Sequence, residues 1–287
     1  YVVDPSEESL NRCKIRFQEV DSYNNKKLNY IQEMSHLPIA IDFAIIATNS
    51  LQRLTVLKEL IKISKVKYLL LEKFLFPKVE EYKEAKELLN KYRVDTYVNC
   101  ARRMWSSYQE LAEEIRNCKK INLKVTGSNW NMGSNSIHFL DLFFYLNGER
   151  QVSINTSRLD KNLLESKRAG YIDFSGTIQA VMENGSELLL TSTVSDKVML
   201  EIIVEFGDYS YTINESQEEI VKYKRGNFIQ KEKFNVYQQS VLTNKIYEQL
   251  SQRETCNLVR FEDSINHHLL LLKAFNSFLG DREGVIT

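Results

Sequence analysis

Short apolar runs alternate with amphipathic segments over the first third of the chain. Residues 43–47, 66–71 and 94–98 are rich in aromatic, β-branched or leucine side chains, and they are short enough to be buried strands. Between them, apolar residues recur at helical spacing in 51–61 and 79–92. Strands and helices that alternate at these lengths indicate right-handed βαβ units and a parallel sheet.

The beginning of the chain predicts a strand that runs directly into a helix. Val2 and Val3 are β-branched, and either Asp4 or Ser6 can cap the helix that follows. Residues 27–33 predict a further short helix. Because the sequence opens without methionine and on the end of a strand, we expect a fragment or a trimmed chain.

The pattern changes after Asn99. It predicts an amphipathic helix over 105–115, an alternating strand over 121–125 and a second helix over 136–146. From 151 to 234, strand follows strand, which is typical of a mostly antiparallel sheet. The turn signals within this region are Asn184-Gly185, Gly207-Asp208 and Arg225-Gly226-Asn227.

Two helices, over 241–250 and 265–279, are predicted to close the chain. The resulting fold class is α/β: a Rossmann-type parallel sheet, followed by an α+β part with a large, mostly antiparallel sheet. We expect a dinucleotide-binding domain at 1–99 and a substrate-binding and oligomerisation domain at 100–287.

Composition narrows the range of partners. The 38 basic and 38 acidic residues give a net charge of zero, which argues against nucleic-acid binding or binding to a membrane surface. No apolar run approaches the length of a membrane span, and no signal peptide is visible. The four cysteines are scattered without a CxxC pair, as in a reducing compartment. We therefore expect a cytoplasmic protein.

The strand over 66–71 ends on an acid and a base, Glu72 and Lys73. The carboxyl end of a strand is where an open α/β sheet binds its ligands. From these residues alone, Lys73 is either a solvated cation paired with Glu72 or a catalytic group.

Three segments, in this order and spacing, resemble a known family. They are Ala47-Thr48-Asn49-Ser50, Glu72-Lys73-Phe74 and the run from Ser134 to Asp141, which contains His138. They are similar to the Thr-Pro-Asn, Glu-Lys-Pro and Asp-x-x-x-His motifs of the glucose-fructose oxidoreductase and inositol dehydrogenase family (Gfo/Idh/MocA). The resemblance covers nearly the whole chain.

The resemblance implies hydride transfer between a nicotinamide cofactor and a hydroxyl-bearing carbon of a sugar, sugar derivative or cyclitol. Such a reaction needs a base for the hydroxyl proton and a positive group to stabilise the alkoxide. Lys73 and His138 match the family's catalytic positions. Without the family, His138 would be read as a packing histidine.

The resemblance also implies where the cofactor binds. Family members begin with a strand and a Gly-x-Gly-x-x-Gly turn, which this chain lacks, and its first residues match the family's second strand. Asp4 would then bind the ribose hydroxyls and favour NAD over NADP; alternatively it is only a helix cap. Thr48, Asn49, Glu72 and Lys73 are the other expected cofactor-binding residues.

Two departures from the family bear on the chemistry. Phe74 stands in place of proline, and since a cis bond before phenylalanine costs about 3 to 4 kcal/mol, we expect a trans bond and an altered pose of Lys73. Ser134 stands in place of an aspartate, one helical turn before His138, where its hydroxyl can still reach the imidazole. Asp141 is either a substitute that orients this imidazole or an ordinary polar helix residue.

Residues after the last strand of the first domain are candidates for substrate binding. Arg102 or Arg103 can bind a carboxylate or phosphate through two hydrogen bonds; the alternative is a pair of surface charges. Trp130 either stacks on a sugar ring or anchors the core. The expected substrate-binding residues are Asn99, Arg102, Arg103, Trp130, Ser134, Asn135 and Asp141.

Other properties follow from the same patterns. No His, Asp or Glu cluster has the spacing of a metal site, and the adjacent His267 and His268 point to different faces of a helix, so we predict no metal. The long sheet suggests a homo-oligomer, a dimer or a tetramer. The alternative to an enzyme is a non-catalytic binding or scaffold protein that kept the fold.

Overall fold

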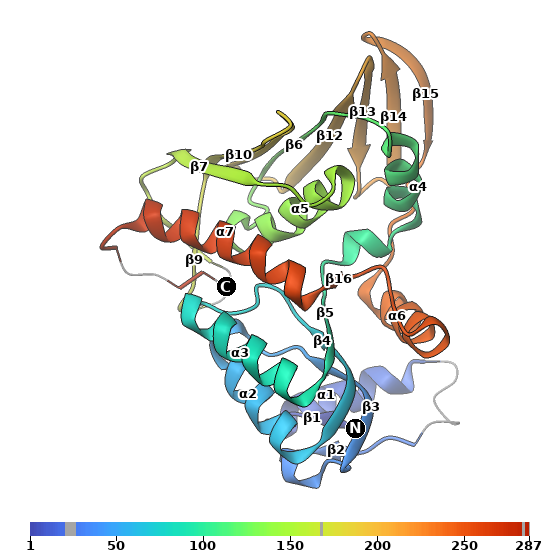
Figure 1. Cartoon of the computed structure of the whole chain (residues 1–287), viewed down its shortest axis with the longest axis vertical. Coiled ribbons are helices and arrows are strands. Elements are labelled where there is room, and N and C mark those ends of the chain that lie inside the picture. Colours follow the sequence, from blue (N-terminus) through green and yellow to red (C-terminus); the bar gives the residue numbers. More distant parts are fainter. Residues whose placement is uncertain (21–26, 167–168, 283–284, 287) are drawn as a thin grey trace.

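A parallel sheet occupies one end of the molecule (Figure 1). The computed structural model describes residues 1–20, 27–166, 169–282 and 285–286. Within them, the sheet has the order β16-β5-β4-β3. Its strands are β3 (Ala40–Ile46), β4 (Lys65–Leu71), β5 (Asp95–Val98) and β16 (Val259–Arg260), and its connecting helices are α2 (Ser50–Ile63) and α3 (Val79–Tyr92).

The first three of these strands pair in parallel, as the sequence predicts, because β4 is buried on both sides. Leu69 and Leu71 are fully buried, and Tyr68 and Leu70 almost so. The antiparallel strand β16 is not predicted, since two residues carry no periodicity.

A small parallel pair precedes this sheet. β1 (Val2–Val3) pairs with β2 (Tyr30–Ile31), and α1 (Glu7–Gln18) lies between them in the chain. The predicted helix over 27–33 is therefore wrong, because its aromatic and β-branched residues pair with Val2 and Val3; residues 21–26 lie outside the described ranges. A 3₁₀ turn, η2 (Met34–His36), follows.

The second sheet is large and bent, and within the described residues it has the order β15-β14-β13-β12-β6-β11-β10-β7. Its strands are antiparallel except for the β6–β11 pair. All three predicted turn signals join antiparallel neighbours. The strands are β6 (Ile121–Ser128), β7 (Val152–Leu159), β10 (Gly176–Met182), β11 (Glu187–Thr193), β12 (Met199–Phe206), β13 (Tyr209–Asn214), β14 (Glu219–Lys224) and β15 (Asn227–Lys233); the short pair β8 (Leu164–Glu165) and β9 (Ile172–Asp173) lies apart.

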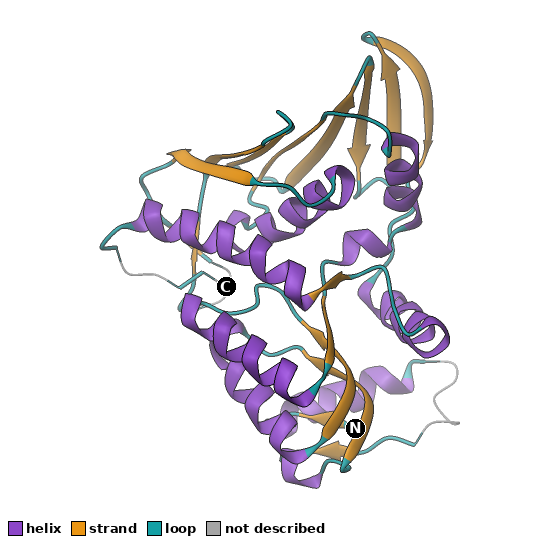
Figure 2. Ribbon diagram, in the orientation of Figure 1, coloured by secondary structure: helices purple, strands orange, loops and turns teal. Residues whose placement is uncertain are grey.

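Helices cover one face of this sheet (Figure 2). They are α4 (Ser106–Ile115), α5 (Met132–Asn147) and α7 (Phe261–Leu279), while α6 (Gln239–Arg253) lies nearer the parallel sheet. The core lies between the helices and the sheet, where Leu123, Val125, Ile202 and Val204 are fully buried. Among the helices of the described ranges, none has both the length and the apolar character that a bilayer crossing needs.

Together these elements form a Rossmann-type parallel sheet followed by a large, mostly antiparallel sheet, so the predicted fold class is confirmed. The fold brings the carboxyl ends of β4 and β5 against the beginning of α5. The 3₁₀ turn η3 (Ala101–Met104) follows β5 at the same place.

Candidate active site

Lys73 connects the parallel sheet to α5. It follows β4, and its Nζ atom donates to the backbone oxygen of Ser134 at 3.0 Å and to Oδ1 of Asn135 at 2.6 Å. Asn135 is in turn fixed by the bond from its Nδ2 to the backbone oxygen of Trp130 at 2.7 Å. The ammonium group is therefore held in one position by the beginning of α5.

The bond between Lys73 and Phe74 is cis, so the expected trans bond is wrong. A trans bond is the local preference of this peptide, and the tertiary contacts of Phe74 lie outside that preference. In the folded chain Phe74 is 1% exposed and packs edge-on against His268, with ring centroids 4.9 Å apart. The buried guanidinium of Arg53 also donates to the backbone oxygens of Phe74, Leu75 and Thr48.

Two cavities meet at this point. The first, the Thr48 cavity, has a volume of about 400 Å³. Thr48 Oγ1 and Ser50 Oγ are both shielded from solvent and have no hydrogen-bond partner in the described part of the chain. The lining residues of the Thr48 cavity are Ala47, Thr48, Ser50, Arg53, Glu72, Lys73, Phe74, Asn131, Ser134 and Ser166.

The second, the His138 cavity, has a volume of about 290 Å³ and shares Glu72 with the first. Its lining residues are Glu72, Asn99, Ala101, Arg102, Trp105, His138 and Gln239. Asn99 donates from Nδ2 to Glu72 and accepts from Nε2 of Gln239 at 3.3 Å. A row of polar side chains therefore runs from β4 across β5 to the start of α6.

His138 lies on α5 with its Nδ1 atom shielded from solvent and unpartnered in the described residues. Burial lowers the pKa of His138 well below its usual value, and the positive charges of Lys73 and Arg102 lower it further. The imidazole is therefore neutral at pH 7 and able to accept a proton.

Neither Ser134 nor Asp141 reaches this imidazole, so of the two alternatives for Asp141 the one in which it orients the imidazole is wrong. The Oγ atom of Ser134 donates to the backbone oxygen of Asn131 at 3.4 Å. Asp141, which is 1% exposed, instead binds Arg103, whose Nε lies 2.7 Å from Oδ2. Helical spacing places Ser134 and Asp141 one turn from His138, but in the fold each of them bonds to another group.

Both arginines bind carboxylates of the chain itself. Arg102 reaches Glu215 on the loop after β13 through Nε at 2.7 Å and Nη2 at 2.6 Å. The hydroxyl of Tyr108 also donates to Glu215, at 2.7 Å. Because both arginine side chains are less than about one-sixth exposed, at 14% for Arg102 and 13% for Arg103, they are not surface charges.

The remaining predicted residues have structural partners. Trp130 is 5% exposed and donates from Nε1 to the backbone oxygen of Thr191 at 3.0 Å, so of the two alternatives it is the core anchor. Asn49 caps α2 by accepting from the backbone N–H of Gln52 at 3.1 Å. Asp4 accepts from the backbone N–H of Ser6 at 2.8 Å and lines neither cavity of the described structure.

Several residues of the site are not predicted from the sequence. Trp105 is two residues after Arg103, and this proximity is a signal that could have placed it among the expected substrate-binding residues. Gln239 and Glu215 have no such signal in the sequence around them. Arg53 interrupts the apolar face of α2, which is the signal of a buried charge with a dedicated role.

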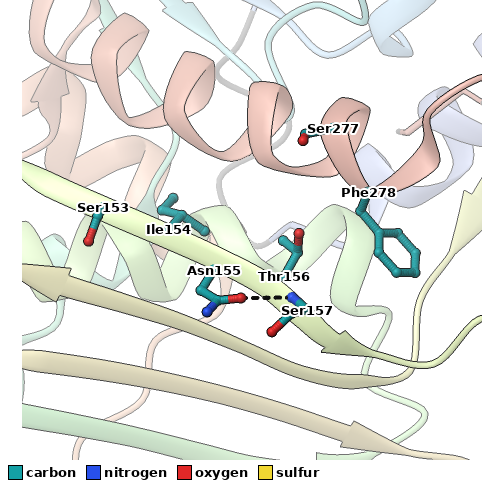
Figure 3. Close-up of a pocket in the computed structure, with 7 residues that line it drawn as sticks. All are labelled: Ser153, Ile154, Asn155, Thr156, Ser157, Ser277 and Phe278. Atoms are coloured by element: carbon teal, nitrogen blue, oxygen red, sulfur yellow. Dashed lines mark hydrogen bonds between the residues drawn. The ribbon is translucent and has the colours of Figure 1, made fainter.

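In the ranges that the structure describes, no three His, Cys, Asp or Glu side chains are placed to hold a metal ion. A cavity of about 660 Å³ lies between β7 and α7 (Figure 3). Its lining residues, from Ser153 to Ser157 with Ser277 and Phe278, include no ionisable group.

No family model and no curated protein sequence matches the chain. Solved structures do. UDP-N-acetylglucosamine 3-dehydrogenase GnnA from Acidithiobacillus ferrooxidans is 13% identical with a TM-score of 0.67, covering 95% of this chain and 95% of that one. An oxidoreductase from Agrobacterium radiobacter, in complex with NAD+, L-tartaric acid and magnesium, is 12% identical with a TM-score of 0.72, covering 99% and 90%.

The transcriptional regulator Gal80p from Kluyveromyces lactis is also similar, at 17% identity and a TM-score of 0.68, covering 99% of this chain and 85% of that one. These similarities confirm that the chain has the Gfo/Idh/MocA fold that its three motifs indicate. At such low identity they establish the fold and leave the reaction to be argued from the site.

Proposed function

We propose that this chain is a nicotinamide-dependent oxidoreductase, which transfers hydride to or from a hydroxyl-bearing carbon of a sugar, sugar derivative or cyclitol. The observation that carries the proposal is the pair of cavities that meet at Glu72, with Lys73 and a neutral histidine beside the junction. One cavity suits a cofactor and the other a small substrate.

The residues of the Thr48 cavity fit the nicotinamide end of a dinucleotide. Thr48 Oγ1 and Ser50 Oγ are buried polar atoms that lack a partner within the described residues, and a carboxamide or a ribose hydroxyl would satisfy them. Lys73 at the edge of this cavity supplies a fixed positive charge. A bound nicotinamide would supply the hydride acceptor.

His138 and Lys73 then share the proton chemistry. Oxidation of an alcohol releases the hydroxyl proton, and the neutral imidazole of His138 is a base for it. The Lys73 ammonium stabilises the negative charge that develops on the same oxygen. Asn135, through its bond to Nζ, holds that charge at a fixed point of the site.

For the cofactor, we favour NAD over NADP. Asp4 directly follows β1, and its carboxylate would repel the 2′-phosphate of NADP. The bond from Ser6 N–H leaves the second carboxylate oxygen available for a ribose hydroxyl, so capping and cofactor binding are compatible.

A non-catalytic regulator is the second candidate, because Gal80p has the same fold. Ser134, in place of the family's aspartate, leaves His138 Nδ1 without a partner in the described residues, as expected where catalysis is no longer maintained.

The test separates the two candidates. We expect saturable binding of NADH, and weaker binding of NADPH, in a fluorescence titration of the purified natural protein. With a sugar or cyclitol substrate found by screening, Lys73→Met and His138→Asn should each lower kcat by about 10²- to 10⁴-fold. Lys91→Met, which changes an exposed lysine of α3, is the matched control and should leave kcat unchanged. Absence of NADH binding would favour the regulator.

A further inference from the structure

A buried arginine joins two loops in the wall of the Thr48 cavity. Arg53 lies near the beginning of α2 and is 2% exposed. Its Nη2 atom donates to the backbone oxygen of Thr48, in the loop after β3. Its Nη1 atom donates to the backbone oxygens of Phe74 and Leu75, in the loop after β4, at 2.7 Å for Leu75. One planar guanidinium group therefore fixes the two loops relative to each other.

Lys73 is held at both of its ends as a result. Its ammonium group bonds to the beginning of α5, through Ser134 and Asn135. The main chain directly after it is fixed by Arg53, because the oxygen of Phe74 belongs to the next residue along the chain. A lysine side chain has many rotamers, and fixing both ends leaves its Nζ atom little freedom to move.

Stability alone accounts poorly for an arginine at this position. Further along the same helix the buried residues are apolar: Leu54, Leu57, Leu60 and Ile61. A guanidinium loses its hydration on burial, and bonds within the protein often only offset that loss, so an apolar residue would stabilise the packing equally well. Since the bonds of Arg53 go to the backbone of two loops, the arginine adds a fixed geometry instead.

We propose that Arg53 is a positioning residue, which sets where Lys73 Nζ and the hydroxyl of Thr48 lie relative to each other in the cavity wall. It acts through the backbone and transfers no proton itself. The proposal rests on the proposed function for what these two groups act on, a cofactor and an alcohol. It adds a side chain that neither the three motifs nor the proton chemistry includes.

The first experiment measures the reactivity of Lys73 and needs no cofactor. Trace acetylation followed by mass spectrometry compares Lys73 with Lys91, an exposed lysine of α3, in the same sample. Arg53→Met keeps a long side chain but removes the bonds to both loops. In this variant we expect Lys73 to react about fivefold faster relative to Lys91, because its Nζ atom is no longer held against α5.

Tyr82→Phe is the matched control, because it also removes a buried group that holds the loop after β4. The hydroxyl of Tyr82 accepts from the backbone N–H of Phe76 at 3.3 Å and donates to its backbone oxygen at 2.9 Å. In the described structure, Tyr82 lines neither the Thr48 cavity nor the His138 cavity. Both variants should lower Tm, but Tyr82→Phe should leave the reactivity of Lys73 unchanged. Equal reactivity of Lys73 in the two variants would overturn the proposal.

Arg53→Lys provides the answer if the methionine variant does not fold. An ammonium group keeps the charge, but it lacks the planar fork that bonds both loops at once. Lys73 should then react about twofold faster than in the natural protein. Reactivity equal to that of the natural protein would mean that the charge suffices without the fork, and the positioning role would be wrong.

A second experiment follows the same variants with the cofactor. We expect Arg53→Met to weaken NADH binding about three- to tenfold and, with a substrate found by screening, to lower kcat about 10- to 100-fold, since Lys73 is displaced from the developing charge. Tyr82→Phe should change neither value. A lower Tm in Arg53→Met, without any change in NADH binding or kcat, would mean that the arginine is purely structural.

The outcomes separate this proposal from the proposed function. If the natural protein binds no NADH, hydride transfer fails, and the acetylation of Lys73 by itself decides the role of Arg53. If NADH binds but Lys73 reacts alike in Arg53→Met and Tyr82→Phe, hydride transfer stands and the positioning role fails.

Discussion

His267 is fully buried, yet both of its ring nitrogens lie close to carboxylates. Nδ1 is 3.4 Å from Oδ1 of Asp141, and Nε2 is 3.0 Å from Oε1 of Glu149. Its ring stacks on Phe144 with centroids 4.0 Å apart. Burial alone lowers the pKa of His267, but the contacts with Asp141 and Glu149 outweigh it and the pKa is raised. The raised pKa favours the protonated imidazole, which lies between Glu149 and Asp141 of α5.

This raised pKa predicts a pH-dependent contribution to stability. The contribution of His267 should be fully present below the unfolded pKa of about 6.5 and should be lost as the pH rises through the higher folded pKa. His267→Gln should therefore cost more free energy of unfolding at about pH 5.5 than at about pH 9, by about 1 kcal/mol. Urea unfolding across this range measures the difference.

The control is His36→Gln, which changes an exposed histidine of η2 by the same substitution. A cost for His267→Gln that is the same at both pH values would show that the imidazole is neutral when folded.

Among the elements, β6 decides where the site is built. It lies between β11 and β12, and its last residue leads through the loop 129–131 into α5, which carries Asn135 and His138. Gly127 makes this pairing possible, because a Cβ atom there would lie 2.0 Å from the backbone oxygen of Met199 on β12. The close approach of two backbones thus aligns the beginning of α5 with Lys73.

We predict that Gly127→Ala lowers the free energy of unfolding by about 2 kcal/mol, because the added methyl pushes β12 away from β6. Thr126→Ala, at the exposed residue before it, should change the free energy by less than about 1 kcal/mol. Urea unfolding of both variants checks the prediction. Equal effects of the two substitutions would mean that the strands separate at little cost.

At the scale of the whole molecule, the large sheet has an outer face that the described helices leave uncovered. The described helices lie on its other face (Figure 2). Across this outer face, five residues paired on neighbouring strands from β11 to β14 form a row in which apolar and polar side chains alternate. All five side chains are half-buried. This row is Leu189, Lys124, Ile203, Thr212 and Val221. A half-apolar sheet face of this kind suits a contact between copies of the chain.

We predict that the natural protein is a dimer or tetramer that buries this row. Ile203→Glu should shift it towards the monomer, since it would place carboxylates in the contact. Light scattering coupled to size-exclusion chromatography measures the mass. Val241→Glu, at a residue of α6 that is 46% exposed, is the control and should leave the mass unchanged. A monomeric natural protein would contradict the prediction.

Residue patterns alone predicted the three parallel strands β3, β4 and β5, the antiparallel hairpins and the helix that carries His138. Each depends on period and burial within one segment, which the local sequence records. The motif around Glu72 and Lys73 was found in the same way, because a buried strand that ends on two charges is a local signal. The strand β2 was missed, and a helix over 27–33 predicted in its place, since a strand of two residues depends on its partner.

By itself, the sequence determined the order of elements and the kinds of side chain at the ends of β4 and β5. Only the tertiary structure decided which partners these side chains take: Arg102 binds Glu215, 113 residues away, and Asp141 binds Arg103 and His267 instead of His138. The cis bond after Lys73 belongs to the same group. The physical reason is that a charged or polar side chain pairs with the most favourable partner within a few ångströms. The local sequence pattern does not record which remote segments lie that close in the folded chain.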